Sequence, residues 1–142
     1  MRNSTIVLAL AGLALSAAPA LAGDPVKGEN DFKKCKACHA IVAADGTEIQ
    51  KGGKTGPNLY GVIGRQVGSE PAFLEKYGPS ILLAGADGTL WDEALIAAYV
   101  TDPTAWLKEK TGDAAAKSKM ALKLTKGGED VAAYLASVAP TE

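Results

Sequence analysis

Five consecutive residues carry most of the chemistry that this 142-residue sequence offers. Residues 35–39 read Cys-Lys-Ala-Cys-His, and they contain both cysteines and the single histidine of the chain. At the C-terminal end of a helix, this spacing puts both thiols within one turn and presents the imidazole directly after them. The C-x-x-C-H pattern is typical of covalent haem attachment, in which the thiols form two thioethers and the imidazole binds iron.

Three other interpretations of this motif stay open. Cys35 and Cys38 could form a thioredoxin-like redox pair, but that motif belongs with a βαβ pattern that the sequence lacks. They could bind zinc with His39, although the fourth ligand would be a carboxylate or water and the adjacent Cys38 and His39 fit a tetrahedron poorly. They could also form a structural disulfide with His39 as an incidental neighbour. A zinc or dithiol protein would be colourless.

The N-terminal residues 1–22 have the form of a secretory signal peptide. Met1 and Arg2 precede the apolar run IVLALAGLALSAA, and Ala-Leu-Ala at 20–22 has the small-x-small form of a cleavage site. A membrane anchor is the alternative, but the run is shorter than the roughly 20 residues that a span needs. We therefore expect one domain over residues 23–142, exported to the periplasm without a stable membrane anchor.

Once Met1 is removed with this segment, Met120 is the last methionine of the chain. It ends the polar stretch Lys-Ser-Lys-Met between two predicted helices, where a thioether could turn inward to bind iron; the commoner role of methionine is to fill a core. With His39 and Met120 both bound, iron would have no open position for a substrate. That arrangement predicts electron transfer rather than catalysis. A haem enzyme or gas-binding protein with a weak or absent Met120 bond is the alternative.

Short helices separated by long loops rich in Gly and Pro are expected to position these groups. The chain is 47% hydrophobic and 22% charged, which suits one compact domain, and its net charge of −1 gives no support for nucleic-acid binding. Gly28 in the first helix suggests a close helix crossing. We find no strand pattern of useful length, and the fold class is all-α, with a loop over 40–68 and helices over 24–36, 69–77, 91–101, 103–110 and 128–138.

The sequence resembles the class I c-type cytochromes, soluble bacterial relatives of mitochondrial cytochrome c, over nearly all of residues 24–138. The motifs that carry the resemblance are CKACH, KTGPNLYGVIGR at 54–65, Trp91 ahead of a helix with Tyr99, KSKM ending at Met120, and a last helix with Tyr134. The resemblance implies the small cytochrome c fold, in which several short helices and long loops wrap around one covalently bound haem c.

The same resemblance implies haem-site roles for four further residues. Pro57 would accept a hydrogen bond from His39 Nδ1–H and fix the ring. Arg65 and Trp91 would hydrogen-bond a buried haem propionate. Tyr99 would direct its hydroxyl towards the methionine sulfur. For each of them, ordinary core packing is the alternative.

The chain also departs from the mitochondrial pattern. Leu122 stands two residues after the axial methionine, where that pattern has an aromatic side chain. Segments 41–50, 69–90 and 104–118 look longer than their mitochondrial counterparts. Tyr77 in the second of them is a candidate for a further propionate contact.

The resemblance implies a monomeric electron carrier that docks transiently on membrane complexes. It would accept an electron from a quinol-oxidising cytochrome bc-type complex and pass it to a photosynthetic reaction centre or a terminal oxidase, in photosynthesis or respiration. A ring of lysines around the haem edge would attract acidic docking sites, although solvated lysines are the alternative. The lysines in question are Lys33, Lys34, Lys36, Lys51, Lys54, Lys117, Lys119 and Lys123.

Overall fold

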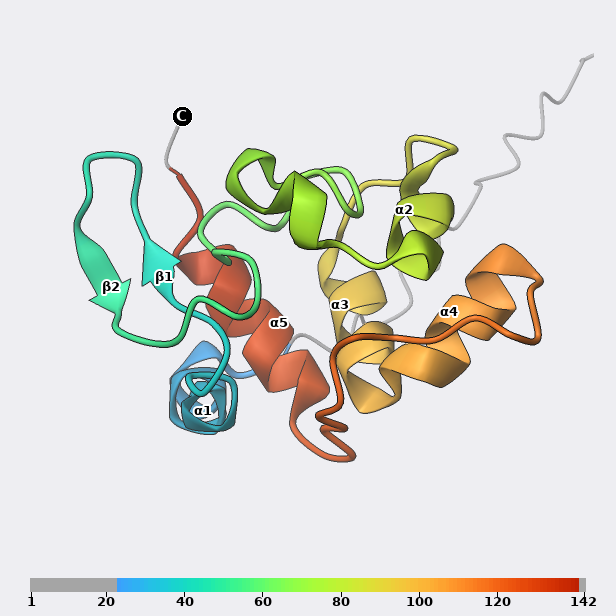
Figure 1. The fold of residues 1–142 in the computed structure, drawn as a ribbon. Helices are drawn as coiled ribbons and strands as arrows, with labels where there is room; N and C mark the ends of the chain where they lie inside the picture. The colour runs from blue at the N-terminus through green and yellow to red at the C-terminus, as the bar shows by residue number, and fades with distance from the viewer. Residues whose placement is uncertain (1–22, 141–142) are drawn as a thin grey trace, which may run out of the picture.

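The computed structural model describes residues 23–140, so the predicted signal peptide, residues 1–22, lies outside them. Short helices joined by long loops make up most of this part of the chain (Figure 1). None of the described helices is long and apolar enough to cross a membrane. The elements are α1 (Pro25–Asp31), η1 (Phe32–Lys34), β1 (Ile41–Val42), β2 (Glu48–Gln50), η2 (Pro71–Lys76), α2 (Pro79–Gly85), α3 (Glu93–Thr101), α4 (Pro103–Thr111) and α5 (Gly128–Ser137).

The crossing of α1 over α5 is the frame of the fold. Asp24 caps α1 by accepting from two backbone N–H groups of its first turn, and its own N–H donates to the Asp130 carboxylate at 2.7 Å. A Cβ on Gly28 would overlap the Asp130 carbonyl oxygen. The Phe32 and Tyr134 rings then pack with their centroids 5.8 Å apart. The close crossing predicted from Gly28 is confirmed.

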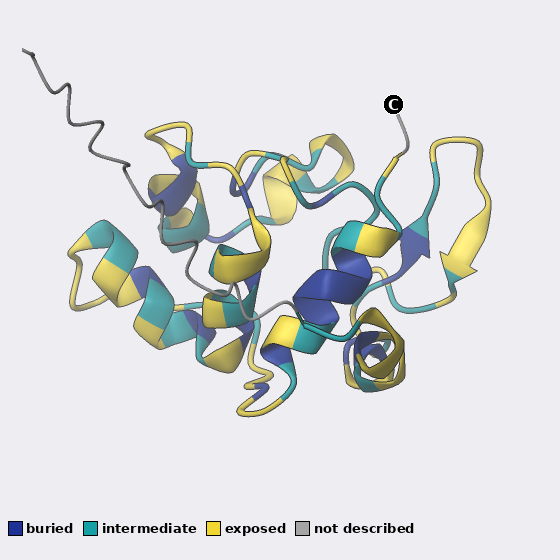
Figure 2. Ribbon diagram, turned by 180° about the vertical axis from the view of Figure 1, so that it is seen from behind, coloured by how far each residue is buried: buried dark blue, intermediate teal, exposed yellow. Residues whose placement is uncertain are grey.

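Helix α5 is the most buried element of the structure. Its side chains from Val131 to Leu135 are buried, and Figure 2 shows this stretch in dark blue. Helix α1 packs against one part of α5 and α3 against another. The largest fully buried side chains around them are Phe32, Ile41, Leu107, Leu135, Val131 and Pro103.

Two aspartates define the limits of α3 and α4. Asp92 accepts from the Leu95 N–H at 2.7 Å and begins α3. Asp102 ends α3 and caps α4 by accepting from the Ala105 N–H at 3.0 Å. Helix α4 ends at Gly112, whose φ of 68° suits glycine. The helices predicted over 91–101 and 103–110 are confirmed.

Two elements depart from the sequence-based expectation. Pro79 begins α2, a helix that the sequence pattern does not predict. In the first turn of a helix its missing N–H costs nothing, because an N–H there has no acceptor within the helix. A small antiparallel hairpin, β1–β2, lies in the region expected to be loop, with Ile41 opposite Gln50. These strands are two and three residues long. Such short strands leave too little alternation to be recognised in a sequence.

The α1–α5 crossing yields a first prediction. Gly28→Ala should lower the free energy of unfolding by about 1–3 kcal/mol, because the added methyl overlaps backbone and forces the helices apart. Without that overlap, alanine would stabilise the helix. Guanidinium unfolding followed by circular dichroism measures the difference. Val26→Ala, at a position 77% exposed in the same helix, is the control and should change stability by at most about 0.5 kcal/mol. Equal stability of the two variants would contradict the packing argument.

Candidate functional site

The two thiols and the imidazole lie on a single turn that follows η1. The N–H groups of Cys38 and His39 both donate to the Cys35 carbonyl, at 3.1 and 3.0 Å. Cys35 is buried and Cys38 is exposed, and both are free thiols rather than a disulfide. Burial raises the pKa of the Cys35 thiol to about 11. The turn therefore presents two unpaired thiols directly before the imidazole.

A glycine-rich segment, residues 52–57, lies directly against this turn. The Gly53 and Gly56 N–H groups donate to carbonyls of the turn at 2.9 and 2.8 Å. A Cβ on Gly52 would overlap the His39 carbonyl oxygen, and a Cβ on Gly56 would overlap the imidazole ring. Glycine is needed at these positions for close approach rather than for an unusual φ. The contact fixes the plane in which the His39 ring lies.

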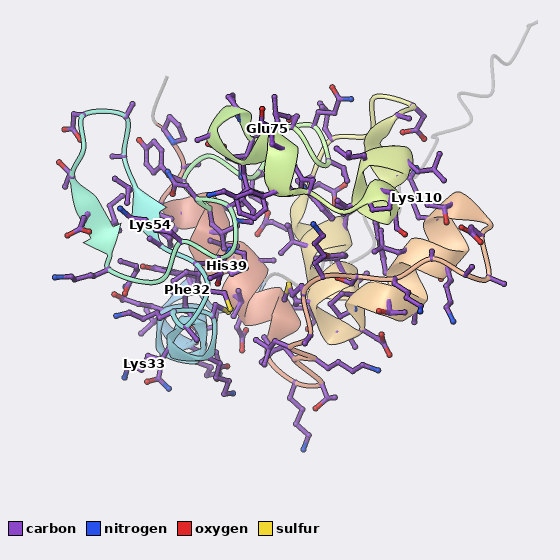
Figure 3. All side chains as sticks on the ribbon, viewed as in Figure 1. Phe32, Lys33, His39, Lys54, Glu75 and Lys110 are labelled. Carbon is purple, nitrogen blue, oxygen red and sulfur yellow. The ribbon has the colours of Figure 1, made fainter. Side chains whose placement is uncertain are left out.

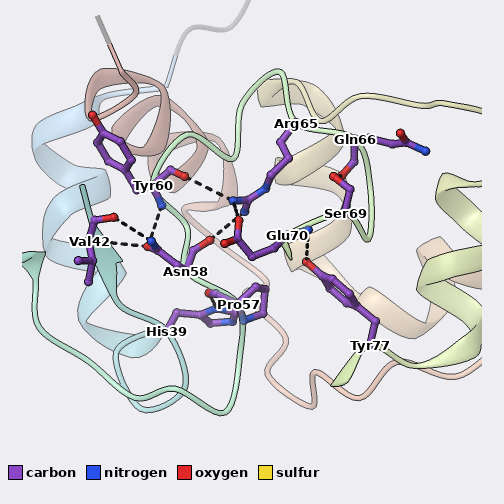
Figure 4. Close-up of polar contacts among 10 residues, drawn as sticks. All are labelled: His39, Val42, Pro57, Asn58, Tyr60, Arg65, Gln66, Ser69, Glu70 and Tyr77. Atoms are coloured by element: carbon purple, nitrogen blue, oxygen red, sulfur yellow. Dashed lines mark hydrogen bonds and ion pairs between the residues drawn. The ribbon is translucent and has the colours of Figure 1, made fainter. Parts of the chain in front are cut away.

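The His39 ring is held in one orientation by the end of the same segment. Its Nδ1 lies 2.8 Å from the Pro57 carbonyl oxygen, so Nδ1–H donates and the Nε2 lone pair remains for another partner (Figure 4). Burial lowers the pKa of His39, and the hydrogen bond to Pro57 offsets part of that effect. The imidazole is therefore neutral at pH 7, the form that binds a metal ion.

Arg65 is anchored next to this segment by backbone carbonyls and one carboxylate. Its guanidinium donates to the Asn58 carbonyl at 2.8 Å and pairs with Glu70 (Figure 4). Both side chains of the pair are 16% exposed. The Glu70 N–H donates to the Tyr77 hydroxyl at 3.4 Å. The sequence predicts a haem propionate beside Arg65, and it gave no signal that Glu70 would be its partner within the chain.

Three aromatic side chains form a cluster beside Arg65. The Trp91 N–H donates to the Arg65 carbonyl at 2.8 Å, which places these two predicted site residues side by side. The ring of Trp91 lies 5.2 Å from that of Tyr99 and 5.3 Å from that of Trp106, between ring centroids. Trp106 falls in a predicted helix but has no predicted role, since one aromatic residue in an amphipathic helix gives no specific signal.

Met120 is half-buried and packs against the hydrophobic core. Its N–H donates to the Ser118 hydroxyl oxygen at 3.0 Å. The sequence predicts that the Tyr99 hydroxyl points to the Met120 sulfur, whereas the structure places that hydroxyl 3.2 Å from Ser118 Oγ. Ser118 Oγ thus lies within hydrogen-bond distance of both the Tyr99 hydroxyl and the Met120 N–H, and it links the two residues.

The donor set fits a haem better than a metal ion bound by the protein alone. Two thiols on one turn, a neutral imidazole offering Nε2 and a thioether on a separate loop are the groups that a c-type haem uses. Over residues 23–140, no group of three His, Cys, Asp or Glu side chains could hold a metal ion. The zinc interpretation therefore lacks its ligands within the described part of the chain.

Most of the lysines predicted for docking lie on the surface of the molecule. In Figure 3, Lys33 and Lys54 lie on the same side of the molecule as His39, and Lys110 lies on the opposite side. Of the eight lysines predicted for docking, Lys36 is half-buried and the others are exposed. Two of the eight lysines form ion pairs with aspartates of the same chain, Lys34 with Asp31 and Lys123 with Asp102.

Comparison with known proteins gives one consistent result. The chain is 61% identical over 138 residues to cytochrome c2 of Rhodobacter capsulatus, covering 97% of this chain and 98% of the relative. It is 57% identical over 120 residues to cytochrome c-550 of Paracoccus pantotrophus, covering 83% and 88%. No protein-family model matches the chain.

Solved structures agree with these relatives. The structure of cytochrome c2 from Rhodobacter capsulatus superposes with a TM-score of 0.79 at 64% identity, covering 82% of this chain and 98% of that one. The X-ray structure of ferric cytochrome c-550 from Paracoccus versutus gives 0.79 at 56% identity, covering 83% and 99%. The predicted fold class is confirmed at the level of the family.

The pairing of Arg65 with Glu70 yields a second prediction. Glu70→Gln removes the charge but keeps the shape, so it should lower the free energy of unfolding by about 1–3 kcal/mol, because the largely buried guanidinium loses the carboxylate it pairs with in the chain. Guanidinium unfolding measures the loss. Glu75→Gln is the matched control, because Glu75 is exposed in helix η2, which Glu70 directly precedes, and should change stability by at most about 0.5 kcal/mol. A loss no larger than that of the control would show that the pair contributes nothing.

Proposed function

The chain belongs to the class I c-type cytochromes, electron carriers with one covalently attached haem, and we propose that His39 and Met120 bind its iron from opposite sides. The observation that carries the proposal is the His39 ring, which is held through Nδ1 by the Pro57 carbonyl at 2.8 Å and offers only Nε2 to a metal. The haem supplies an iron that alternates between ferrous and ferric states by one electron.

Cys35 and Cys38 attach the haem through two thioethers in this proposal. The two residues lie on the turn that ends in His39, so attachment and ligation use one rigid piece of backbone. Segment 52–57 packs so closely against that turn that its glycines leave no room for a Cβ, and this close packing would hold His39 in place on one side of the haem. A fixed ligand geometry favours transfer of an electron without rearrangement of the protein.

Met120 would supply the second protein ligand of the iron and thereby determine the type of reaction. A thioether ligand raises the reduction potential of a haem, and a filled sixth position leaves no place for a substrate. Tyr99 acts on this ligand through Ser118, which accepts from the Met120 N–H. Electron transfer follows from this ligand pair.

Arg65 and Trp91 would bind a haem propionate in this proposal. A buried carboxylate is costly unless charged or polar donors satisfy it. The backbones of the two residues are hydrogen-bonded to each other, and the Arg65 guanidinium is largely buried. Tyr77 lies at the Glu70 end of the same network and could serve a second propionate contact.

We place the protein in the periplasm, exported by residues 1–22 and working between membrane complexes. A quinol-oxidising cytochrome bc-type complex would reduce it, and a photosynthetic reaction centre or a terminal oxidase would oxidise it. The exposed lysines near the His39 turn support transient docking on acidic surfaces of these partners.

The ligand assignment yields a third prediction. Met120→Ala should leave both thioethers intact while opening the iron to carbon monoxide in the ferrous form and to cyanide in the ferric form. The reduction potential should fall, because the thioether raises it. Visible absorption spectra and potentiometric titration measure both changes. The wild-type spectrum should already show a six-coordinate, low-spin iron.

Leu122→Ala is the matched control for this substitution, because Leu122 lies on the same loop two residues later and is 37% exposed. It should bind neither ligand more strongly than wild type. If Met120→Ala keeps the wild-type potential and gains no ligand binding, the assignment of Met120 fails.

The docking surface yields a fourth prediction. Electron transfer with a purified membrane cytochrome bc-type complex should slow steeply as ionic strength rises from 10 to 200 mM, since the Debye length falls from about 30 Å at 0.01 M to about 8 Å at 0.15 M. Stopped-flow kinetics measure the bimolecular rate constant. Lys54→Ala should lower that constant at low salt and make it less sensitive to salt.

Lys126→Ala removes the same charge from a surface cavity bordered by α3 and the start of α5, outside the proposed docking surface. It should behave like wild type at every salt concentration. A rate constant independent of salt, or equal effects of the two lysine substitutions, would rule out docking through this surface.

A further inference from the structure

The loop that carries Met120 is tied to a distant segment, residues 76–80, at the end of η2 and the start of α2. The Lys117 N–H donates to Ser80 Oγ at 3.1 Å. The Lys119 ammonium donates to the Lys76 carbonyl at 2.8 Å. Between these contacts, the aliphatic part of Lys119 lies along the buried Gly78, where a Cβ would sit 3.4 Å from Lys119 Cγ. Segment 76–80 thus contacts two residues of the stretch that leads into Met120, Lys117 and Lys119.

The other side of the same loop is held by α3 and α4. The Ser118 N–H donates to Thr104 Oγ1 at 3.2 Å, and Ser118 Oγ lies 3.2 Å from the Tyr99 hydroxyl. The Met120 loop therefore lies between segment 76–80 and the helices α3 and α4. A loop held from two sides opens only when one set of contacts breaks.

The backbone of this loop depends on side-chain acceptors. Outside helices and strands, the backbone-to-backbone hydrogen bonds of the described chain include Ala116 N–H to Asp113 and Leu124 N–H to Val100, but none that involves residues 117–123. The N–H groups of Lys117, Ser118 and Met120 instead donate to serine and threonine hydroxyls. A segment with so few backbone contacts opens locally at low cost. Each hydroxyl contact is then a large part of what keeps it closed.

We propose that segment 76–80 is a clasp that holds the Met120 loop closed, with Ser80 and Lys119 as its positioning residues. The inference rests on the proposed binding of iron by Met120. The clasp belongs to the 69–90 insertion, so it gives that insertion a function: to set how often the thioether leaves the iron. The clasp acts on the Met120 side only, because its contacts reach residues 117 and 119 and not the His39 turn.

Imidazole binding to the ferric full-length protein tests the clasp, because imidazole can reach the iron only when the Met120 loop opens. Ser80→Ala should raise the association constant for imidazole about two- to tenfold, the effect of losing one hydrogen bond of ordinary strength. Ser80→Thr keeps the hydroxyl and should restore the wild-type value. Spectroscopic titration and stopped-flow kinetics give the association constant and the opening rate.

Two matched controls separate the clasp from general effects of substitution. Ser69→Ala removes a half-buried serine hydroxyl that bonds the Gln66 carbonyl of its own turn, and it should leave imidazole binding unchanged. Lys119→Ala should raise imidazole binding. Lys117→Ala removes the same charge from the same loop but keeps its backbone N–H, and should match wild type.

The outcomes distinguish the clasp from the ligand assignment. If the wild-type spectrum shows no methionine-bound, low-spin iron, the proposed function fails and the clasp with it. If that iron is present and Ser80→Ala binds imidazole like Ser69→Ala, only the clasp is overturned. Global stability provides a second readout: if Ser80→Ala lowers the free energy of unfolding in guanidinium without raising imidazole binding, the contact supports the whole fold rather than the closed loop, and the clasp is overturned.

Discussion

The close contact between segment 52–57 and the turn of residues 35–39 is the constraint on which the site depends. Glycines approach the turn so closely that any side chain would overlap its backbone or the imidazole. The last carbonyl of the segment consequently faces Nδ1, and His39 can offer only Nε2. The next residue, Asn58, accepts from Arg65. Consecutive residues of one loop therefore set the position of both the imidazole and the guanidinium, which ties the metal ligand to its electrostatic surroundings.

The helices form the packed frame of the protein, whereas the proposed iron ligands lie outside the helices, in turns and loops. The α1–α5 crossing depends on backbone packing at Gly28, and neither helix contributes an iron ligand. The two proposed ligands are held in different ways. His39 is fixed by backbone that cannot move without disturbing the turn, whereas Met120 is fixed by separate hydrogen bonds to hydroxyl groups. Separate hydrogen bonds break one at a time, so the methionine side is the one that yields when an external ligand enters.

Part of this structure can be predicted from the sequence, because the contacts involved join residues that are close together in the chain. The caps at Asp92 and Asp102 act on residues three positions away, and the CKACH motif lies within one turn, so all of these contacts are local in the sequence. Contacts between distant segments have no such signature. Ser80 meets the loop 37 positions later, and nothing in the sequence around it indicates that contact. Glu70 was missed for a related reason, because a carboxylate near an arginine in a loop is ordinary until burial of the pair is known.

Charged side chains occur in two different environments, in the largely buried Arg65–Glu70 pair and in the lysines on the surface. The Arg65–Glu70 pair is largely buried, where neighbouring charges act through a low dielectric and salt screens them little. The lysines predicted for docking are mostly exposed, where salt screens them within about 8 Å at physiological ionic strength. In the proposed function, the buried pair would belong to the surroundings of the haem, and the exposed lysines would act on encounter with a partner. Because these are different side chains, we expect ionic strength to change docking while the buried pair is little affected.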